Sequence, residues 1–291
     1  MTVSAPGQKI SSGFDADVDT VISVDEVARQ ARVLARGVVL EHLDALAGPD
    51  PALQIDDLRA GYGQMEILHG FNLRVARGQS LCLIGPNGAG KSTVLHSIFG
   101  FTTIYSGSIL TNHGSGRADV THLSANQKLR SAGIAYILQD KSVFPNMTVE
   151  ENLWMGGFLM EQPAAAKLAA DQVFDRYPRL AARRKHPARV LSGGERRLLE
   201  ISRALVMEPK VLLVDEPSIG LEPRFIDMVF EILGDLQHKE GKTIVMVEQN
   251  AKKGLEFANV GYVLVSGELA IAGKASELLA DPDVGRLFLG G

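Results

Sequence analysis

The sequence has little of what marks a secreted, membrane-spanning or nucleic-acid-binding protein. Its 291 residues include one cysteine, which excludes an internal disulfide and a cysteine metal cluster and fits a reducing cytoplasm. No apolar run approaches the ~20 residues of a membrane span, and the N-terminus lacks the basic start and apolar block of a signal peptide. The net charge of −4 provides no basic field for nucleic acid. If the protein works at a membrane, we expect other subunits to supply the spans.

A glycine-rich segment lies between apolar runs at 81–84 and 94–99, which predicts a strand, a turn and a helix. Its residues are Gly85, Pro86, Asn87, Gly88, Ala89, Gly90, Lys91, Ser92 and Thr93. Glycines allow a tight turn whose N–H groups point at phosphate oxygens, and the helix start adds the positive end of its dipole. Lys91 can reach the outer phosphates, and the Ser92 hydroxyl can bind magnesium. The segment therefore predicts a site for a nucleoside triphosphate with Mg²⁺.

Two acidic residues, Asp215 and Glu216, follow the aliphatic run 211–214. Such a run is typical of a strand that is buried on both faces of a parallel sheet. In phosphate-loop enzymes an aspartate at the end of such a strand holds magnesium next to the loop serine. The following glutamate points the other way, where it can polarise a water molecule for in-line attack on the γ-phosphorus. The pair therefore predicts hydrolysis of the bound triphosphate.

Short strands alternate with helices around this loop, which predicts an α/β fold with a mostly parallel sheet. An antiparallel β subdomain before the loop and a helical subdomain over about 140–208 are additions to that core. The expected strands are 53–58, 67–68, 71–75, 80–84, 108–111, 133–138, 211–214, 243–247, 263–265 and 269–271. The expected helices are 94–99, 124–130, 196–207, 223–236 and 282–289, with others after Thr148, Pro163 and Asn250.

Residues 1–50 precede this pattern and are expected to form an N-terminal extension to a domain over 51–291. Residues 1–22 are polar and lack periodicity, which favours a disordered leader. Ser23 and Glu26 have the spacing of a capping box at the start of a helix that we expect to reach Leu46. That helix can either pack on the flank of the domain, the favoured interpretation, or act as an arm that binds a partner.

A second phosphate cradle is indicated by Ser192, Gly193 and Gly194, which open a helix. In isolation this string indicates only an N-capped helix. Because it lies between the phosphate loop and the acidic pair, the string is specific evidence for a family. From about residue 53 to the C-terminus the chain resembles the nucleotide-binding subunits of ABC transporters. The resemblance implies a RecA-like phosphate-loop core, ATP hydrolysis coupled to transport, and a peripheral position on the cytoplasmic face of a membrane.

The resemblance also implies roles for individual residues. Tyr62 looks like the aromatic residue that stacks on adenine, and Gln139 like the glutamine that contacts magnesium and senses the membrane partner. Residues 218–222 occupy the position of the dimer-interface loop, with Glu222 where aspartate is usual. This departure keeps the charge but lengthens the side chain.

A larger departure is Gln249, which stands where the family has a histidine that contacts the γ-phosphate and the catalytic water. Glutamine can donate a hydrogen bond there but cannot carry a positive charge, so we expect weaker help to the transition state. The string 247–250 resembles the one in an ATPase subunit of branched-chain amino-acid importers and their urea and amide relatives. Segments 147–153 and 289–291 are similar to that branch too.

In this family each ATP needs the phosphate loop of one subunit and the Ser-Gly-Gly cradle of another, which implies a homo- or heterodimer. The resemblance also implies integral membrane permeases and, indirectly, a periplasmic or extracellular binding protein, with no nucleic-acid partner. The motion would reach the permease through the segment after Gln139 and the helix at Thr148. An ATPase for another cargo, such as an exported lipid, and a nucleotide-gated regulatory protein are the alternatives.

Overall fold

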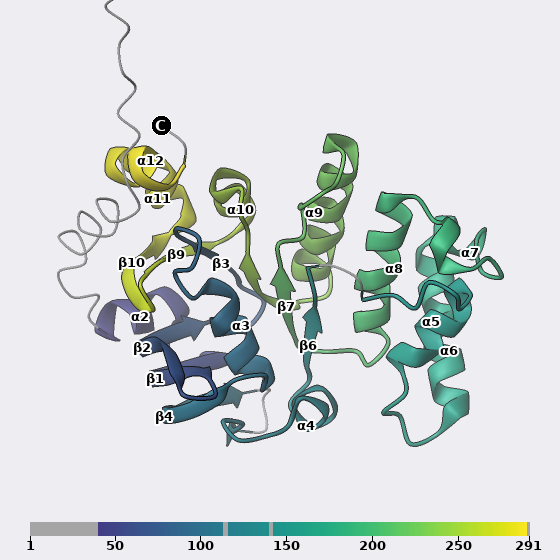
Figure 1. Cartoon of the computed structure of the whole chain (residues 1–291), viewed down its shortest axis with the longest axis horizontal. Coiled ribbons are helices and arrows are strands. Elements are labelled where there is room, and N and C mark those ends of the chain that lie inside the picture. Colours follow the sequence, from purple (N-terminus) through teal and green to yellow (C-terminus); the bar gives the residue numbers. More distant parts are fainter. Residues whose placement is uncertain (1–39, 113–115, 140–141, 290–291) are drawn as a thin grey trace, which may run out of the picture.

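A computed structural model of the chain describes residues 40–112, 116–139 and 142–289 (Figure 1). The expected leader at 1–22 and the capping box at Ser23 lie outside the described residues, as do the last two residues of the 289–291 segment. Among the described residues, no helix combines the length and the apolar character needed to cross a membrane.

The central sheet has six strands in the order β10-β9-β3-β8-β7-β6. These are β10 (Glu268–Lys274), β9 (Val260–Val265), β3 (Ser80–Ile84), β8 (Thr243–Val247), β7 (Val211–Asp215) and β6 (Ile134–Ile137). All neighbours are parallel except β10, which pairs antiparallel with β9. Every residue of β3, β7 and β8 is buried, because helices or the second sheet cover both faces of these aliphatic strands. The predicted mostly parallel core is confirmed.

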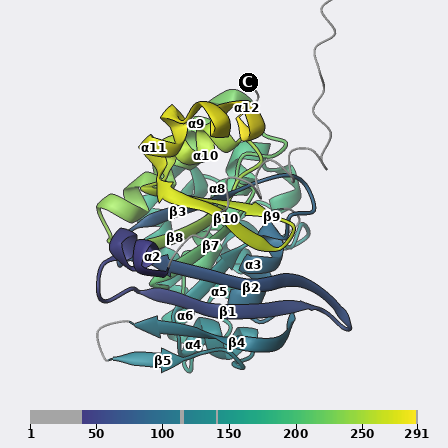
Figure 2. The ribbon, with the colours of Figure 1, turned by 90° about the vertical axis from the view of Figure 1, so that its left-hand side faces the viewer.

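A second, antiparallel sheet of four strands has the order β2-β1-β4-β5. Its members are β1 (Leu53–Tyr62), β2 (Met65–Val75), β4 (Thr103–Asn112) and β5 (Arg117–Asp119). The expected strands 67–68 and 71–75 are one strand, and β4 begins five residues before the expected Ser108. The first residues of β4 are largely exposed and do not alternate, so only their pairing with β1 makes them a strand. Figure 2 shows this sheet beneath the parallel layer.

Helix α3 (Lys91–Phe99) lies between the two sheets and fills the core. Its Val94, Leu95 and Ile98 belong to one apolar cluster with residues of both sheets. On the other face of the parallel sheet a second cluster joins Cys82 to residues of α9 (Pro223–His238) and α10 (Ala251–Phe257). Cys82 is free and buried, so it acts as a small apolar side chain. Strand β3, which leads into the loop before α3, is therefore covered by an apolar cluster on each face.

The remaining helices cover the ends of the sheets (Figure 1). They are α4 (Ala125–Arg130), α5 (Val149–Gly156), α6 (Pro163–Arg176), α7 (Pro178–Ala181), the short 3₁₀ helix Ala188–Val190, α8 (Gly193–Leu205), α11 (Ala275–Ala280) and α12 (Pro282–Phe288). Helices α5, α6 and α8 have their own apolar cluster, which includes Leu153, Phe174 and Leu199. They lie beyond β6, at the opposite end of the molecule from β10, as Figure 1 shows.

Helix α2 (Leu40–Ala47), the end of the expected 23–46 helix, packs beside β2 and β10 (Figure 2). Leu43 is fully buried, and His42 Nε2 lies 2.9 Å from the carbonyl oxygen of Ala272. The guanidinium of the buried Arg74 bridges Asp44, at 2.9 Å, and Asp56, at 2.5 Å. The described part of this helix therefore packs on the flank, the interpretation that the sequence favoured.

Candidate functional site

The glycine-rich segment forms the loop between β3 and α3. Gly85 has a φ of 142°, and a Cβ there would lie 2.1 Å from the carbonyl oxygen of Leu264. Gly90 caps α3 in the left-handed region, with φ 99°. These backbone positions exclude larger side chains, so the loop wraps tightly at the start of the helix. The ammonium of Lys91 bends back over the loop and donates to the carbonyl oxygens of Gly85 and Pro86, each at 2.9 Å.

A cavity of about 340 Å³ lies over this loop. It is lined by Tyr62, Met65, Ile67, Asn87, Gly88, Gly90, Lys91, Ser92, Thr93 and Glu216. Tyr62 ends β1 at the rim with 40% of its surface exposed, so its ring is available for stacking. The structure therefore brings together the expected base-binding residue, the phosphate loop and the expected catalytic carboxylate.

The acidic pair lies beside Ser92 at the end of β7. The Ser92 hydroxyl donates to Asp215 Oδ1 at 3.2 Å, and the Gln139 amide donates to Glu216 Oε2 at 2.9 Å. Glu216 has a φ of 43°, and its N–H donates to the carbonyl of Val247 at 2.9 Å. A positive φ is uncommon for a non-glycine residue, and here the backbone leaves the extended conformation directly after the last residue of β7.

Charge and burial shift the pKa values of the central groups. Burial raises the pKa of the Glu216 carboxyl, and the negative charges of Asp215 and Glu248 raise it further. Burial lowers the pKa of Lys91, although the charges of Glu216 and Asp215 oppose that shift. A carboxylate with a raised pKa is a stronger base than an ordinary glutamate. Glu216 is thus suited to accept a proton from water.

The oxygen-bearing side chains at this point fit a magnesium ion. Ser92, Asp215 and Gln139 offer a hydroxyl, a carboxylate and an amide oxygen, and Mg²⁺ binds such hard oxygen ligands together with substrate phosphates and water. No group of three or more histidine, cysteine or acidic residues within the described ranges could hold a metal ion by itself.

Two residues that the sequence did not single out, His96 and Tyr136, connect Tyr62 to Asp215. His96 Nδ1 lies 2.5 Å from the Tyr62 hydroxyl, and burial lowers the pKa of His96. The Tyr136 hydroxyl donates to Asp215 Oδ2 at 2.7 Å. His96 contacts both tyrosine rings edge-on. Neither residue belongs to a motif, and only the packing of α3 against β1 and β6 brings them together.

Gln249 lies in the turn between β8 and α10 with an exposed side chain, and it does not line the phosphate-loop cavity. Its neighbour Glu248 is buried. The Glu248 carboxylate accepts from the Ser218 hydroxyl at 2.7 Å and from the Asn250 N–H at 3.0 Å. Glu248, also missed in the sequence, therefore ties the turn that carries Gln249 to the loop that follows Glu216.

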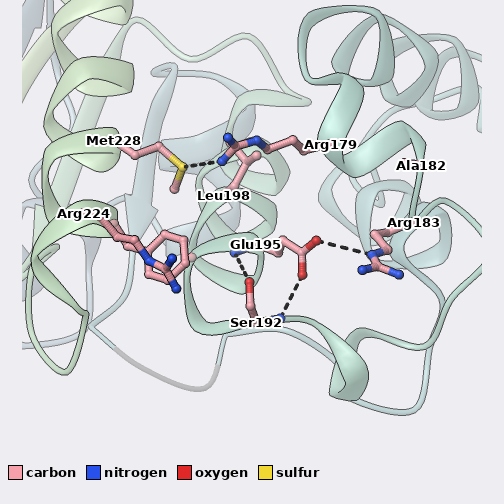
Figure 3. A pocket seen from close by; sticks show the side chains of 10 residues that line it. Arg179, Ala182, Arg183, Ser192, Glu195, Leu198, Arg224 and Met228 are labelled. Atoms are coloured by element: carbon pink, nitrogen blue, oxygen red, sulfur yellow. Dashed lines mark hydrogen bonds and ion pairs between the residues drawn. The ribbon is translucent and has the colours of Figure 1, made fainter.

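The residues predicted to form a second phosphate cradle lie elsewhere, as Figure 3 shows for Ser192. Ser192 caps α8 in a capping box with Glu195, whose N–H donates to the serine hydroxyl at 3.3 Å. A Cβ at Gly194 would lie 2.1 Å from the ring of Phe225, so only glycine fits there. A groove of about 540 Å³ runs past Ser192 and Gly194 between α7, α8 and α9. None of the three cradle residues lines the phosphate-loop cavity.

A family model described as ABC transporter matches residues 68–219, more than half of the chain. The chain belongs to the ABC transporter family. It is 38% identical over 233 residues, 80% of its length and 96% of the relative's, to the probable branched-chain amino acid transport ATP-binding protein LivF of Archaeoglobus fulgidus. It is 39% identical over 239 residues, 82% of its length and the whole relative, to the high-affinity branched-chain amino acid transport ATP-binding protein BraG of Pseudomonas aeruginosa.

A solved ATP-binding cassette of an ABC transporter in its ADP conformation superposes with a TM-score of 0.70 and 26% identity. The match covers 82% of this chain and 98% of that one. The predicted family and phosphate-loop α/β fold are confirmed, and the chain is an ATP-binding and ATP-hydrolysing subunit of an ABC transporter.

Proposed function

We propose that this ABC ATPase powers the import of branched-chain amino acids through separate membrane subunits. The observation that carries the proposal is the 38% and 39% identity to two branched-chain amino acid transport ATP-binding proteins, over nearly their whole lengths. Lipopolysaccharide export ATP-binding proteins are similar over the same span at 31% and 28% identity, which supports lipid export less. Urea or a short amide is the alternative import cargo, since the string 247–250 resembles that branch as well.

Transport assays on the assembled complex test the cargo. A complex purified through a tag on this chain and reconstituted in vesicles should take up radiolabelled leucine or valine when ATP is present on the ATPase side. Uptake of urea or an amide without leucine would replace the proposed cargo. ATP binding with little turnover, by a chain that co-purifies with no membrane subunit, would favour a nucleotide-gated regulatory protein.

In the proposed reaction the phosphate loop holds ATP, the Lys91 ammonium exchanges its carbonyl partners for phosphate oxygens, and Tyr62 stacks on adenine. Ser92 and Asp215 would hold a magnesium ion, with Gln139 beside them, and such an ion would supply positive charge to the phosphates. Glu216 is the base that takes a proton from the attacking water. Its raised pKa, caused by burial and two neighbouring carboxylates, supports this assignment.

A second ABC subunit completes the site in this proposal. The phosphate-loop cavity and the groove at Ser192 share no residue, so each nucleotide would lie between the loop of one subunit and the cradle of the other. Either a second copy of this chain or a related subunit can fill that role. Residues 51–291 form the ATPase domain, with a helical subdomain at about 140–208, and residues 1–50 are an extension.

The permease subunits would dock on a groove of about 390 Å³ between α4, β6, α5 and α8. Three apolar side chains that line it, Phe144, Met155 and Phe158, are exposed, and the Arg203 guanidinium lies 5.6 Å from the centroid of the Phe144 ring. Gln139 lies in the chain between Ile137 and Ser142, which both line this groove, and this position supports Gln139 as the link between the γ-phosphate and the permease. This contact would hold the chain at the cytoplasmic face of the membrane as a peripheral subunit. A periplasmic or extracellular binding protein would deliver cargo on the far side.

The substitution Gln249→His tests whether Gln249 limits turnover. A histidine can donate to the γ-phosphate and carry positive charge, so we expect ATP turnover of the assembled transporter to rise on the order of tenfold. Phosphate release at saturating ATP measures it. Gln172→His, on the exposed side of α6, is the matched control and should leave turnover unchanged. Unaltered turnover in the Gln249→His transporter would count against a rate-limiting role.

A further inference from the structure

Asp215 accepts two side-chain hydrogen bonds, one on each oxygen. Ser92 donates to Oδ1 at 3.2 Å and Tyr136 donates to Oδ2 at 2.7 Å. The serine belongs to the phosphate loop and has a proposed role of its own as a metal ligand. Tyr136 belongs to β6 and has no such role, so its hydroxyl serves as a donor to the carboxylate alone.

Packing fixes the Tyr136 ring in the position that this bond requires. Strand β6 pairs with β7 so that Tyr136 is opposite Leu213, two residues before Asp215. The ring lies 5.5 Å from the Phe99 ring, 5.8 Å from His96 and 6.0 Å from Phe101, between centroids. Four aromatic rings thus pack together and leave the phenol little freedom. Its hydroxyl reaches Asp215 across the end of β7.

The Tyr136 hydroxyl is the donor in this bond, because an ionised carboxylate can only accept. A hydrogen bond from a neutral donor to a carboxylate stabilises its charged form, which is the form that binds a cation.

We propose that Tyr136 is a positioning residue that orients the Asp215 carboxylate toward the magnesium ion bound with the nucleotide. The inference rests on the proposed role of Ser92 and Asp215 in holding that ion. Groups that orient metal-binding carboxylates commonly affect metal affinity by about 10- to 100-fold. Loss of the phenol oxygen should therefore weaken metal binding without changing how the phosphate loop holds the nucleotide.

The substitution Tyr136→Phe removes the hydroxyl and keeps the ring in its aromatic cluster. We expect half-maximal ATP hydrolysis to require about tenfold more free Mg²⁺. We expect Mn²⁺ binding in the presence of ADP, followed by electron paramagnetic resonance, to weaken by a similar factor. The affinity for ATP in EDTA should stay at the wild-type value, because the substitution changes none of the residues proposed to contact ATP.

Tyr262→Phe is the matched control. The Tyr262 hydroxyl donates to the carbonyl of Arg74 at 3.2 Å, so this variant also loses a buried phenol bond, but away from Asp215. It should keep the wild-type Mg²⁺ requirement. Wild-type Mg²⁺ and Mn²⁺ dependence in Tyr136→Phe would overturn the inference, as would an equal loss of ATP binding in EDTA, which indicates a structural role. If the wild-type chain itself showed no Mg²⁺-dependent hydrolysis, the proposed function would fail instead.

Discussion

Replacement of Glu216 by glutamine is expected to lower steady-state ATP hydrolysis by ~10³-fold, the scale on which a general base contributes, and to leave ATP binding close to wild type. Glutamine keeps the shape of the side chain but cannot take a proton from water. The change also removes a negative charge from the wall of the cavity that holds the phosphates, so binding has no reason to weaken. Phosphate release by the assembled transporter and equilibrium binding of a fluorescent ATP analogue measure the two quantities.

Glu256→Gln is the control for the loss of one carboxylate. Glu256 is an exposed residue of α10, outside the cavity, and its replacement should leave hydrolysis unchanged. If Glu216→Gln hydrolysed ATP at the wild-type rate, the base would have to be another group. If it lost ATP binding instead, the carboxylate would serve in binding and its raised pKa would have no catalytic meaning.

The parts of the site that adjoin one another in sequence were predictable. Lys91 and Ser92 follow directly from the glycine turn, and Asp215 and Glu216 from the end of an aliphatic strand. In each case a local pattern fixes both the backbone and the chemistry. The parallel core was predictable for the same reason, since β3, β7 and β8 are short aliphatic runs between helices.

The partners of those residues were not predictable, because they depend on which strands become neighbours. Tyr136 contacts Asp215 because β6 pairs with β7. Glu248 contacts Ser218 because β8 lies on the other side of β7. No spacing along the chain encodes that order. The start of β4 was missed for a related reason, since its exposed residues become a strand by pairing with β1.

Replacement of Ser192 by aspartate should lower ATP hydrolysis by ~10³-fold while the chain keeps its fold. Aspartate is as good an N-cap as serine, so α8 should start as before. A carboxylate about 4 Å from a phosphate of the partner-held ATP costs about 4 kcal/mol at an effective dielectric constant near 20, which corresponds to ~10³-fold in rate. Ser124→Asp is the matched control, because Ser124 caps α4 in the same kind of box but has no proposed contact with nucleotide.

The most direct test of a site shared between two subunits is the ATP turnover of the assembled transporter with Ser192→Asp, compared with ATP binding by the same variant as an isolated chain. We predict that turnover falls by ~10³-fold while the isolated chain binds ATP as the wild type does. A dimer of two copies carries the change at both sites, whereas with a different second subunit the fall is confined to the site that pairs this chain's cradle with that subunit's phosphate loop. Wild-type turnover, or loss of ATP binding by the isolated chain, would contradict a nucleotide held between the Lys91 loop of one subunit and the Ser192 cradle of the other.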